Sequence, residues 1–573
     1  MLNGRGLAVL IIAAVAAGPA GRLQPPEADL VLLDGHIVTV DAGFRVATAL
    51  AVRDGRFIAV GSNEAVRAHV GTTTRVIEAR GRTVIPGIID THVHALGVAE
   101  AEAVQPFRNL RSIEALQAWI RDAAARGARD AWIWTPRVFP TRLRERRFPT
   151  RQELDAAAPE RPVVVDGAYA FVLNGAALRA AGITRASPDP PGGAIVKDGA
   201  GHPTGLLRNV GSLLDRFRPA STSASPDALE RVHRQYLAAG ITSVIERGAS
   251  VEGYRVYETL RRADRLRVRS SVTIRLPAAQ EPDGLHQFID DLPFRFGSGD
   301  DWLKVGPLKI VADGGILIGT SFMKEPFGLG ARQLYAVEDA SYRGFLTLTP
   351  ERIAEAIAAG HRRGWQMVAH VTGDAGVEVV LDAIERAQGA GPPRDLRHTL
   401  IHAYFVTPET AARAARLGVL VDTQPAWYYK DADALSQALG RERLAHFVGL
   451  ATWRKAGVDV AINTDHMFGL DRDEAMNPFN PFLTMYAATT RRTEAGRVVS
   501  AGEAVSREVA LRMMTRDAAR FSFDEANRGS IEPGKLADFV VIDDHLLTCE
   551  PERLRSIRAD LTILDGRVVF ARQ

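Results

Sequence analysis

Short apolar runs, separated by polar turns, occupy both ends of the chain. They are rich in β-branched residues, and Asp-Gly pairs or single glycines interrupt them, as is typical of small antiparallel sheets. The runs lie in ADLVLLDGHIVTVD (28–41), ATALAVRDGRFIAVG (47–61), RVIEARGRTVIPG (75–87), GSIEPGKLADFVVIDD (529–544) and LTILDGRVVFA (561–571). We therefore expect residues 28–84 and 528–573 to form one β-sandwich together.

The long middle of the chain alternates strand signals with helical ones. Eight apolar runs are expected to be parallel strands, at 83–95, 240–249, 267–276, 305–314, 365–373, 397–406, 418–427 and 457–466. Helical patterns separate the later runs, at 349–364, 374–389 and 407–418. Because strands that alternate with helices form parallel sheets, and eight such units close into a barrel, the expected fold class is α/β. Residues 85–97 and 240–527 should form this (β/α)8 TIM barrel.

One interval departs from the regular alternation of predicted strands and helices. Between the first and second predicted strands lie about 140 residues, which is too long for a connecting loop. We expect residues 98–239 to form an inserted subdomain.

Composition and charge are ordinary for a soluble globular protein. Of the 573 residues, 46% are hydrophobic and 24% charged, and the formal net charge is only +3. Because basic and acidic residues nearly balance, charge gives no argument for a nucleic-acid partner, and none is expected.

The N-terminus has the pattern of a secretory signal peptide. Arg5 precedes an apolar segment from Leu7 to about Ala17, and small residues follow, with a cleavage site near Ala20. The apolar segment is shorter than the roughly twenty residues that a membrane span needs. We therefore expect residues 1–20 to be a signal and the protein to be periplasmic or extracellular, without stable membrane insertion after cleavage. An uncleaved anchor is the alternative.

Metal-binding residue types stand near the ends of the predicted barrel strands. His92 and His94 lie one residue apart in PGIIDTHVHA, so both side chains point to the same face of a strand. Later strands add Lys309, His370, His402 and Asp465. In a barrel of this kind the chemistry takes place where strands end and helices follow.

Each of these residues also has a structural interpretation when taken singly. A histidine can be a satisfied core residue, a lysine can be paired at the surface, and an aspartate after a strand can cap a helix. The chain holds only 14 histidines, however, and four of them fall near the strand ends. Taken together, the positions indicate a site for a divalent metal, because neutral imidazole and carboxylate are good ligands for zinc and similar ions.

These residues and their surroundings resemble the amidohydrolase superfamily of metal-dependent hydrolases, specifically the branch called amidohydrolase 3 or YtcJ-like. The resemblance covers nearly the whole chain after the signal. It includes PGIIDTHVH, RRFPTRQELDAAAPERPVVV, NGAALRAAGI, GGAIVKDGAGHPTGLL, LKIVADGG, AHVTGDAGVEVVLDAIE, RHTLIHA and GSIEPGKLADFVVID.

The resemblance assigns a role to each candidate. It implies that His92 and His94 are the family's His-x-His pair and that His370 and His402 are ligands from the fifth and sixth strands. It further implies that Asp465 is both a ligand and the proton shuttle. Lys309 matches the fourth-strand lysine, typically carboxylated in this family to bridge two metals. A carbamate is anionic, whereas an ammonium would repel a metal ion.

Three departures from the family pattern leave this set intact. The sixth strand has Ile401-His402 instead of Glu-His, and the eighth has Thr464-Asp465-His466 instead of Ser-Asp and a small residue. The insert has VVVDGAYAFVLNG where an Asp-x-His is usual. Because of these departures, the substrates of better-known members are no sufficient basis for naming the substrate of this chain.

The expected function is hydrolysis of an amide-type C–N bond in a small molecule. One or two divalent ions, zinc by first preference, would activate water, and Asp465 would carry its proton to the leaving nitrogen. An ester, lactone, carbamate or N-formyl hydrolase would use the same residues, and a non-catalytic binding or regulatory protein on this scaffold is the alternative from another class. The family also implies a homodimer.

Overall fold

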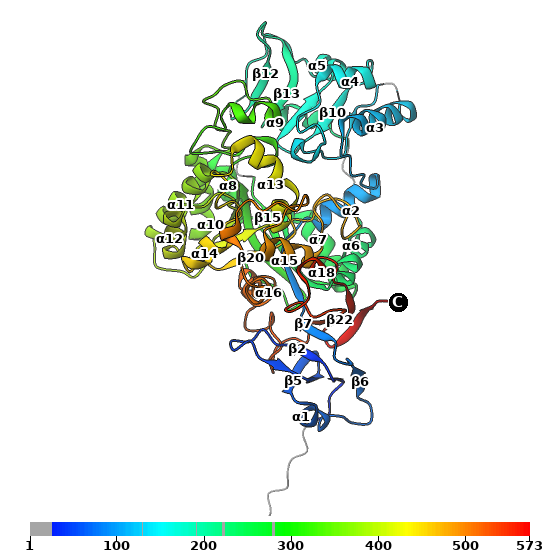
Figure 1. Ribbon diagram of the computed structural model, residues 1–573. Coiled ribbons are helices and arrows are strands. Elements are labelled where there is room, and N and C mark those ends of the chain that lie inside the picture. The colour runs from blue at the N-terminus through cyan, green and yellow to red at the C-terminus, as the bar shows by residue number, and fades with distance from the viewer. Residues whose placement is uncertain (1–25, 129, 191, 220–223, 278–280) are drawn as a thin grey trace, which may run out of the picture.

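The computed structural model describes residues 26–128, 130–190, 192–219, 224–277 and 281–573. The predicted signal peptide, residues 1–20, lies outside this part of the chain. Figure 1 shows three bodies in a row: a small β-sheet body at the bottom, a barrel with surrounding helices in the middle, and a second β-rich body at the top. Within the described residues, none of the helices combines the length and the apolar character needed to cross a bilayer.

Eight parallel strands form the barrel in the middle. They are β8 (Ile88–Val93), β14 (Ile241–Ala249), β15 (Arg269–Arg275), β16 (Leu303–Val311), β17 (Met367–Val371), β18 (Thr399–His402), β19 (Leu420–Thr423) and β20 (Val460–Ile462). Each strand pairs with its neighbour in chain order, from β8 to β20. The ring closes where Val93 forms a parallel bridge with His466. The predicted barrel is confirmed.

Helices surround the barrel, and they cover strands whose residues are buried on both faces. They include α6 (Pro226–Ala238), α7 (Val251–Arg262), α8 (Pro282–Asp290), α10 (Pro350–Arg362), α11 (Asp374–Gly389), α12 (Pro408–Arg416) and α14 (Leu450–Lys455). The Thr349 side chain accepts a hydrogen bond from the backbone N–H of Arg352 and caps α10, as the Thr-Pro-Glu sequence predicts. Gly240 and Gly364 have φ of 85° and 78° just before strands, a conformation that favours glycine.

The two ends of the chain build a β-sandwich below the barrel. One sheet consists of β1 (Leu30–Leu33), β4 (Ala49–Arg53), β5 (Arg56–Gly61) and β6 (Arg75–Glu78). The other consists of β2 (His36–Val38), β3 (Val46–Ala47), β7 (Thr83–Pro86), β21 (Phe539–Ile542), β22 (Ala559–Leu564) and β23 (Arg567–Ala571). Strand β21 pairs with β7, and Phe57 packs against Phe539 between the sheets. The sandwich shared by both ends is thus confirmed.

A further five-stranded sheet lies between β8 and β14 in the chain. Its strands are β9 (Ile133–Trp134), β10 (Val163–Asp166), β11 (Ala170–Leu173), β12 (Ala194–Lys197) and β13 (Pro203–Arg208), and the helices α3 (Ile113–Arg126), α4 (Arg151–Ala157) and α5 (Gly175–Ala181) accompany them. Figure 1 places this body at the end of the barrel opposite the sandwich. The body that contains β9 to β13 and the sandwich therefore cover different ends of the barrel.

A buried ion pair joins the barrel to the sandwich. Arg269, at the start of β15, donates hydrogen bonds to both carboxylate oxygens of Asp538 at 2.7 and 3.0 Å. A third hydrogen bond runs from Arg269 to Asp565 at 3.2 Å. Because the Arg269 side chain is fully buried, these carboxylates take the place of water in stabilising its positive charge.

We expect Arg269→Met to destabilise the fold by about 3–5 kcal/mol, since it leaves Asp538 buried without its partner. The shift of the urea unfolding midpoint measures this. The matched control is Arg332→Met, because Arg332 pairs with Glu338 while both are mostly exposed. The control should change stability by less than about 1 kcal/mol. Equal midpoints for the two variants would contradict a structural role for the Arg269 pair.

Candidate metal centre

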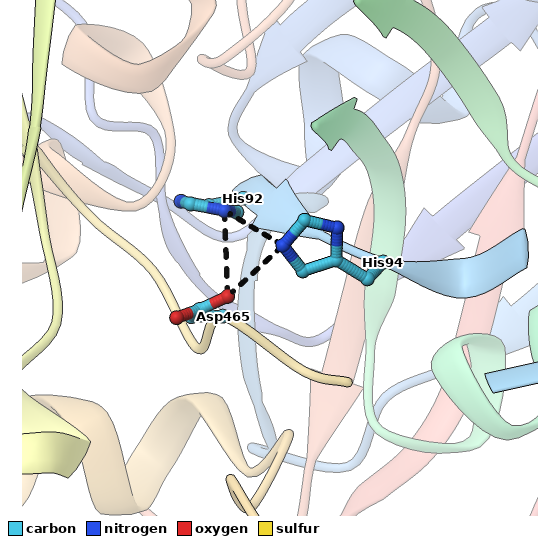
Figure 2. Close-up of side chains that lie close together, drawn as sticks. All are labelled: His92, His94 and Asp465. Atoms are coloured by element: carbon cyan, nitrogen blue, oxygen red, sulfur yellow. Dashed lines mark hydrogen bonds and ion pairs between the residues drawn. The ribbon is translucent and has the colours of Figure 1, made fainter. Parts of the chain in front are cut away.

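The first strand of the barrel brings two imidazoles together. His92 lies in β8 and His94 directly follows it, so both point to the barrel interior. The two Nε2 atoms are 3.2 Å apart. Figure 2 shows both rings converging on one carboxylate, that of Asp465.

Asp465 follows the last strand of the barrel and completes this group. Its Oδ1 atom lies 3.3 Å from Nε2 of His92 and 3.4 Å from Nε2 of His94. In the described part of the chain, this buried oxygen accepts no hydrogen bond. The residue has a φ of 48°, and Asn477 holds its carbonyl with a hydrogen bond of 2.6 Å. The three side chains offer ligand atoms within 4.8 Å of one another, which suits a metal ion.

A second pair of imidazoles lies beside the first. Nδ1 of His370 and Nε2 of His402 are 2.8 Å apart. The remaining nitrogens have their own contacts, His370 with the carbonyl of Gly314 at 3.0 Å and His402 with Gln424 at 2.7 Å. The rings of His92 and His402 are 5.4 Å apart, so the two pairs adjoin.

Lys309 lines the cavity that these residues share. Its Nζ atom donates a hydrogen bond to the carbonyl of Arg247 at 3.0 Å. Burial lowers the pKa of Lys309 to about 7, although Asp465 raises it. A substantial share of the amine is therefore uncharged near neutral pH.

Burial, and after it nearby positive charge, favours the metal-binding forms of the histidines. Burial and the nearby Lys309 hold the pKa of His92 and His94 well below the usual value. The same two causes lower the pKa of His370 to about 3. All of these imidazoles are therefore neutral, and neutral imidazole is the form that binds metals. Burial raises the pKa of Asp465 well above its usual value, while Lys309 lowers it.

Supporting contacts orient the candidate ligands. Glu246 lies 3.9 Å from Nδ1 of His94 and accepts hydrogen bonds from the backbone N–H of Leu96 and from Tyr257. Asp90 accepts hydrogen bonds from the backbone N–H and hydroxyl of Thr464, which join the first strand to the segment after the last one. Sequence reasoning missed Glu246, and its only signal was an acid inside an apolar strand.

The centre opens into a cavity of about 720 Å³. Barrel residues form one side, and Arg137, Tyr169 and Asn209, from the body that contains β9 to β13, form the other. The ring of Tyr169 lies 5.3 Å from that of His370. Among the described residues, both polar atoms of the Asn209 amide lack a hydrogen-bond partner. The cavity thus has room and polar groups for a small molecule.

The residues present fit a divalent metal. The unsatisfied Asp465 oxygen faces two neutral imidazoles, and a cation among them would satisfy all three groups. The structure thus brings His92, His94 and Asp465 into one group, His370 and His402 into an adjoining pair, and Lys309 to the same cavity.

A comparison with family models matches residues 75–570 to the amidohydrolase family. The chain belongs to the amidohydrolase family. The match spans the barrel, the residues between the first two barrel strands and the sandwich strands from β6 onward, while β1 to β5 lie before it. This amidohydrolase is therefore a metal-dependent hydrolase of C–N bonds other than peptide bonds.

Curated relatives and solved structures match this amidohydrolase along most of its length. The putative amidohydrolase YtcJ of Bacillus subtilis is 27% identical and covers 91% of this chain and 96% of its own. An N-substituted formamide deformylase of Arthrobacter pascens is 28% identical, covering 95% and 98%. An uncharacterized metal-dependent hydrolase from Pyrococcus horikoshii has the same fold, with a TM-score of 0.65 at 20% identity, covering 91% of this chain and 99% of its own.

Proposed function

We propose that the protein hydrolyses an amide C–N bond in a small molecule at the centre formed by His92, His94 and Asp465. His370 and His402 would hold a second ion, and a carboxylated Lys309 would bridge the two. Zinc is the expected metal, because imidazole nitrogen and carboxylate oxygen are ligands that it accepts readily. The observation that carries the proposal is the approach of the unsatisfied Asp465 oxygen to both imidazoles of the His-x-His pair.

The side chains of this centre divide the chemistry between them. A bound divalent ion would lower the pKa of water and polarise the carbonyl of the substrate. Asp465 accepts a proton from the attacking water and later donates it to the leaving nitrogen. The water oxygen forms the new bond to the carbonyl carbon, the C–N bond breaks, and a carboxylic acid and an amine result.

Lys309 has a place in this scheme as a carbamate. The uncharged amine adds to carbon dioxide, releases a proton and becomes an anion with two oxygens. Its position in the cavity wall, among residues whose imidazoles are neutral, supports this assignment. An ammonium at the same position would repel a cation bound by the histidines.

The acyl group could be as small as formyl. The relative from Arthrobacter pascens is an N-substituted formamide deformylase, and it matches 95% of this chain. An N-formyl hydrolase is thus the second candidate, because it would use the same residues and differ only in the acyl group that the cavity accepts.

The test is metal analysis combined with a hydrolysis screen. Purified protein should contain about one to two equivalents of a divalent metal, and it should hydrolyse members of a panel of N-acyl amines, N-formyl amines, N-acyl amino acids and cyclic amides. A chelator should abolish the activity, and added zinc should restore it. A protein with full metal content and no turnover across the panel would contradict the proposal.

We also propose that the protein is exported after cleavage near Ala20. The support is the order of Arg5, an apolar segment and small residues at the N-terminus. N-terminal sequencing of protein from the periplasm or medium should then begin near residue 21. Exported protein that still begins at Met1 would refute cleavage.

A further inference from the structure

Several arginines line the cavity beside the metal centre, and most of them have a carboxylate partner. The paired residues are Arg137 with Asp166 at 3.3 Å, Arg218 with Asp215 at 3.2 Å and Arg247 with Asp422 at 2.8 Å. Arg275 differs from these. Across the residues that the structure describes, its guanidinium has neither a hydrogen bond nor an ion pair, although it lines the same cavity and is exposed.

Among the described residues, no carboxylate side chain forms an ion pair with Arg275. All aspartates and glutamates of the chain lie among the described residues, and each ion pair they form there is with another residue. A guanidinium is always charged at neutral pH and matches a carboxylate with two parallel hydrogen bonds. The positive charge of Arg275 is thus available to a ligand in the cavity.

The position of Arg275 places this charge next to the reaction centre. It is the last residue of β15, and its Cα atom is the register partner of Lys309 in β16. The neighbouring backbone N–H of Leu276 donates to the carbonyl of Lys309 at 2.9 Å. Because adjacent strands are about 4.8 Å apart and register partners share a face, a group bound by Arg275 would lie close to the bond that is broken.

The remaining wall of the cavity is partly apolar. Phe139, Leu317, Trp427 and Phe468 contribute hydrophobic surface. A ligand that fits this lining has a negative group at one side and an apolar substituent at another.

We propose that the substrate is an acidic amide, with an apolar substituent and a carboxylate near the scissile C–N bond, and that Arg275 binds this carboxylate. The inference rests on the proposed amide hydrolysis and names its substrate class. Arg275 is then a specificity-determining residue that holds no metal. If Arg275 instead served the carbamate of Lys309, its loss would lower the metal content.

The experiment compares an acid with its neutral counterpart. N-acetylleucine and N-acetylleucinamide, each as both enantiomers, differ only in the carboxylate, and acetate release reports cleavage of the same bond in both. We would measure kcat/KM, calorimetric Kd and metal content for the wild-type holoenzyme, Arg275→Gln and the control Arg218→Gln. The control removes a cavity arginine that already pairs with Asp215 and stacks over Trp134 at 4.6 Å.

The wild type should have a higher kcat/KM for N-acetylleucine, the acid, than for N-acetylleucinamide, its neutral counterpart. Arg275→Gln should lower kcat/KM for N-acetylleucine and weaken its binding by about ten- to a hundredfold, the effect of losing one charge-assisted hydrogen bond. The values for N-acetylleucinamide and the metal content should stay unchanged. Arg218→Gln should keep the acid preference. Equal losses for acid and amide, a fall in metal content, or a wild type without acid preference would overturn the inference. Absence of turnover on any amide would contradict only the proposed hydrolysis, because Kd still tests Arg275.

Discussion

Asp465→Asn should lower kcat by about 10²- to 10⁴-fold, the usual contribution of a positioned acid–base group. The amide of asparagine has nearly the shape of the carboxylate, but it cannot accept a proton from water and return it to the leaving nitrogen. The four histidines remain in place, so most of the bound metal should be retained. Steady-state kinetics on a substrate from the screen and metal analysis of the same preparation measure both effects.

The matched control for this variant is Asp433→Asn. Asp433 is also a buried carboxylate, and it lies on helix α13 (Pro425–Leu439). It forms an ion pair with Arg497 at 2.7 Å and does not line the cavity. The control should retain nearly normal kcat. Normal turnover in Asp465→Asn, with the control behaving likewise, would remove Asp465 from its role as proton shuttle.

Lys309→Ala is expected to remove most of the metal and with it the activity, because a bridging group is lost and neither ion keeps its full set of ligands. Acetate, propionate or another short carboxylic acid should restore part of the activity, since its carboxylate can occupy the place of the carbamate. Metal content and kcat, each measured against the concentration of added acid, report the rescue.

Lys304→Ala is the matched control for the bridge. Lys304 lies in the same strand, but its Nζ atom forms an ion pair with Asp524 and it does not line the cavity. This variant should keep its metal and respond to carboxylic acids like the wild type. If Lys309→Ala also kept two ions without added acid, the carbamate bridge would be wrong.

The sequence predicts the barrel and the sandwich well because both depend on local patterns. Strands buried on both faces form continuous apolar runs, and the Thr-Pro-Glu sequence at residues 349–351 marks the start of a helix. Parallel strands place their ends at one edge, so strand order alone brings His92, Asp465 and the other candidates near one another.

Local sequence patterns do not predict residues whose role depends on contacts with residues far away in the chain. Glu246 lies beside His94, and Arg275 lines the cavity without a carboxylate partner among the described residues. Both facts depend on how the strands of the folded barrel lie next to one another. Tyr169 and Asn209 reach the cavity from residues between the first two barrel strands, where the chain has no repeating unit to set their position. Long-range packing decides these contacts, and sequence spacing does not record it.

The central claim is that the strand-end residues hold metal ions, and anomalous X-ray diffraction from crystals of the purified holoprotein tests it most directly. Data on both sides of the zinc absorption edge should give one peak among His92, His94 and Asp465 and a second beside His370 and His402. Electron density on Lys309 should extend beyond Nζ as a carbamate between the two peaks. Metal bound elsewhere, or two occupied sites beside an unmodified Lys309, would contradict the account.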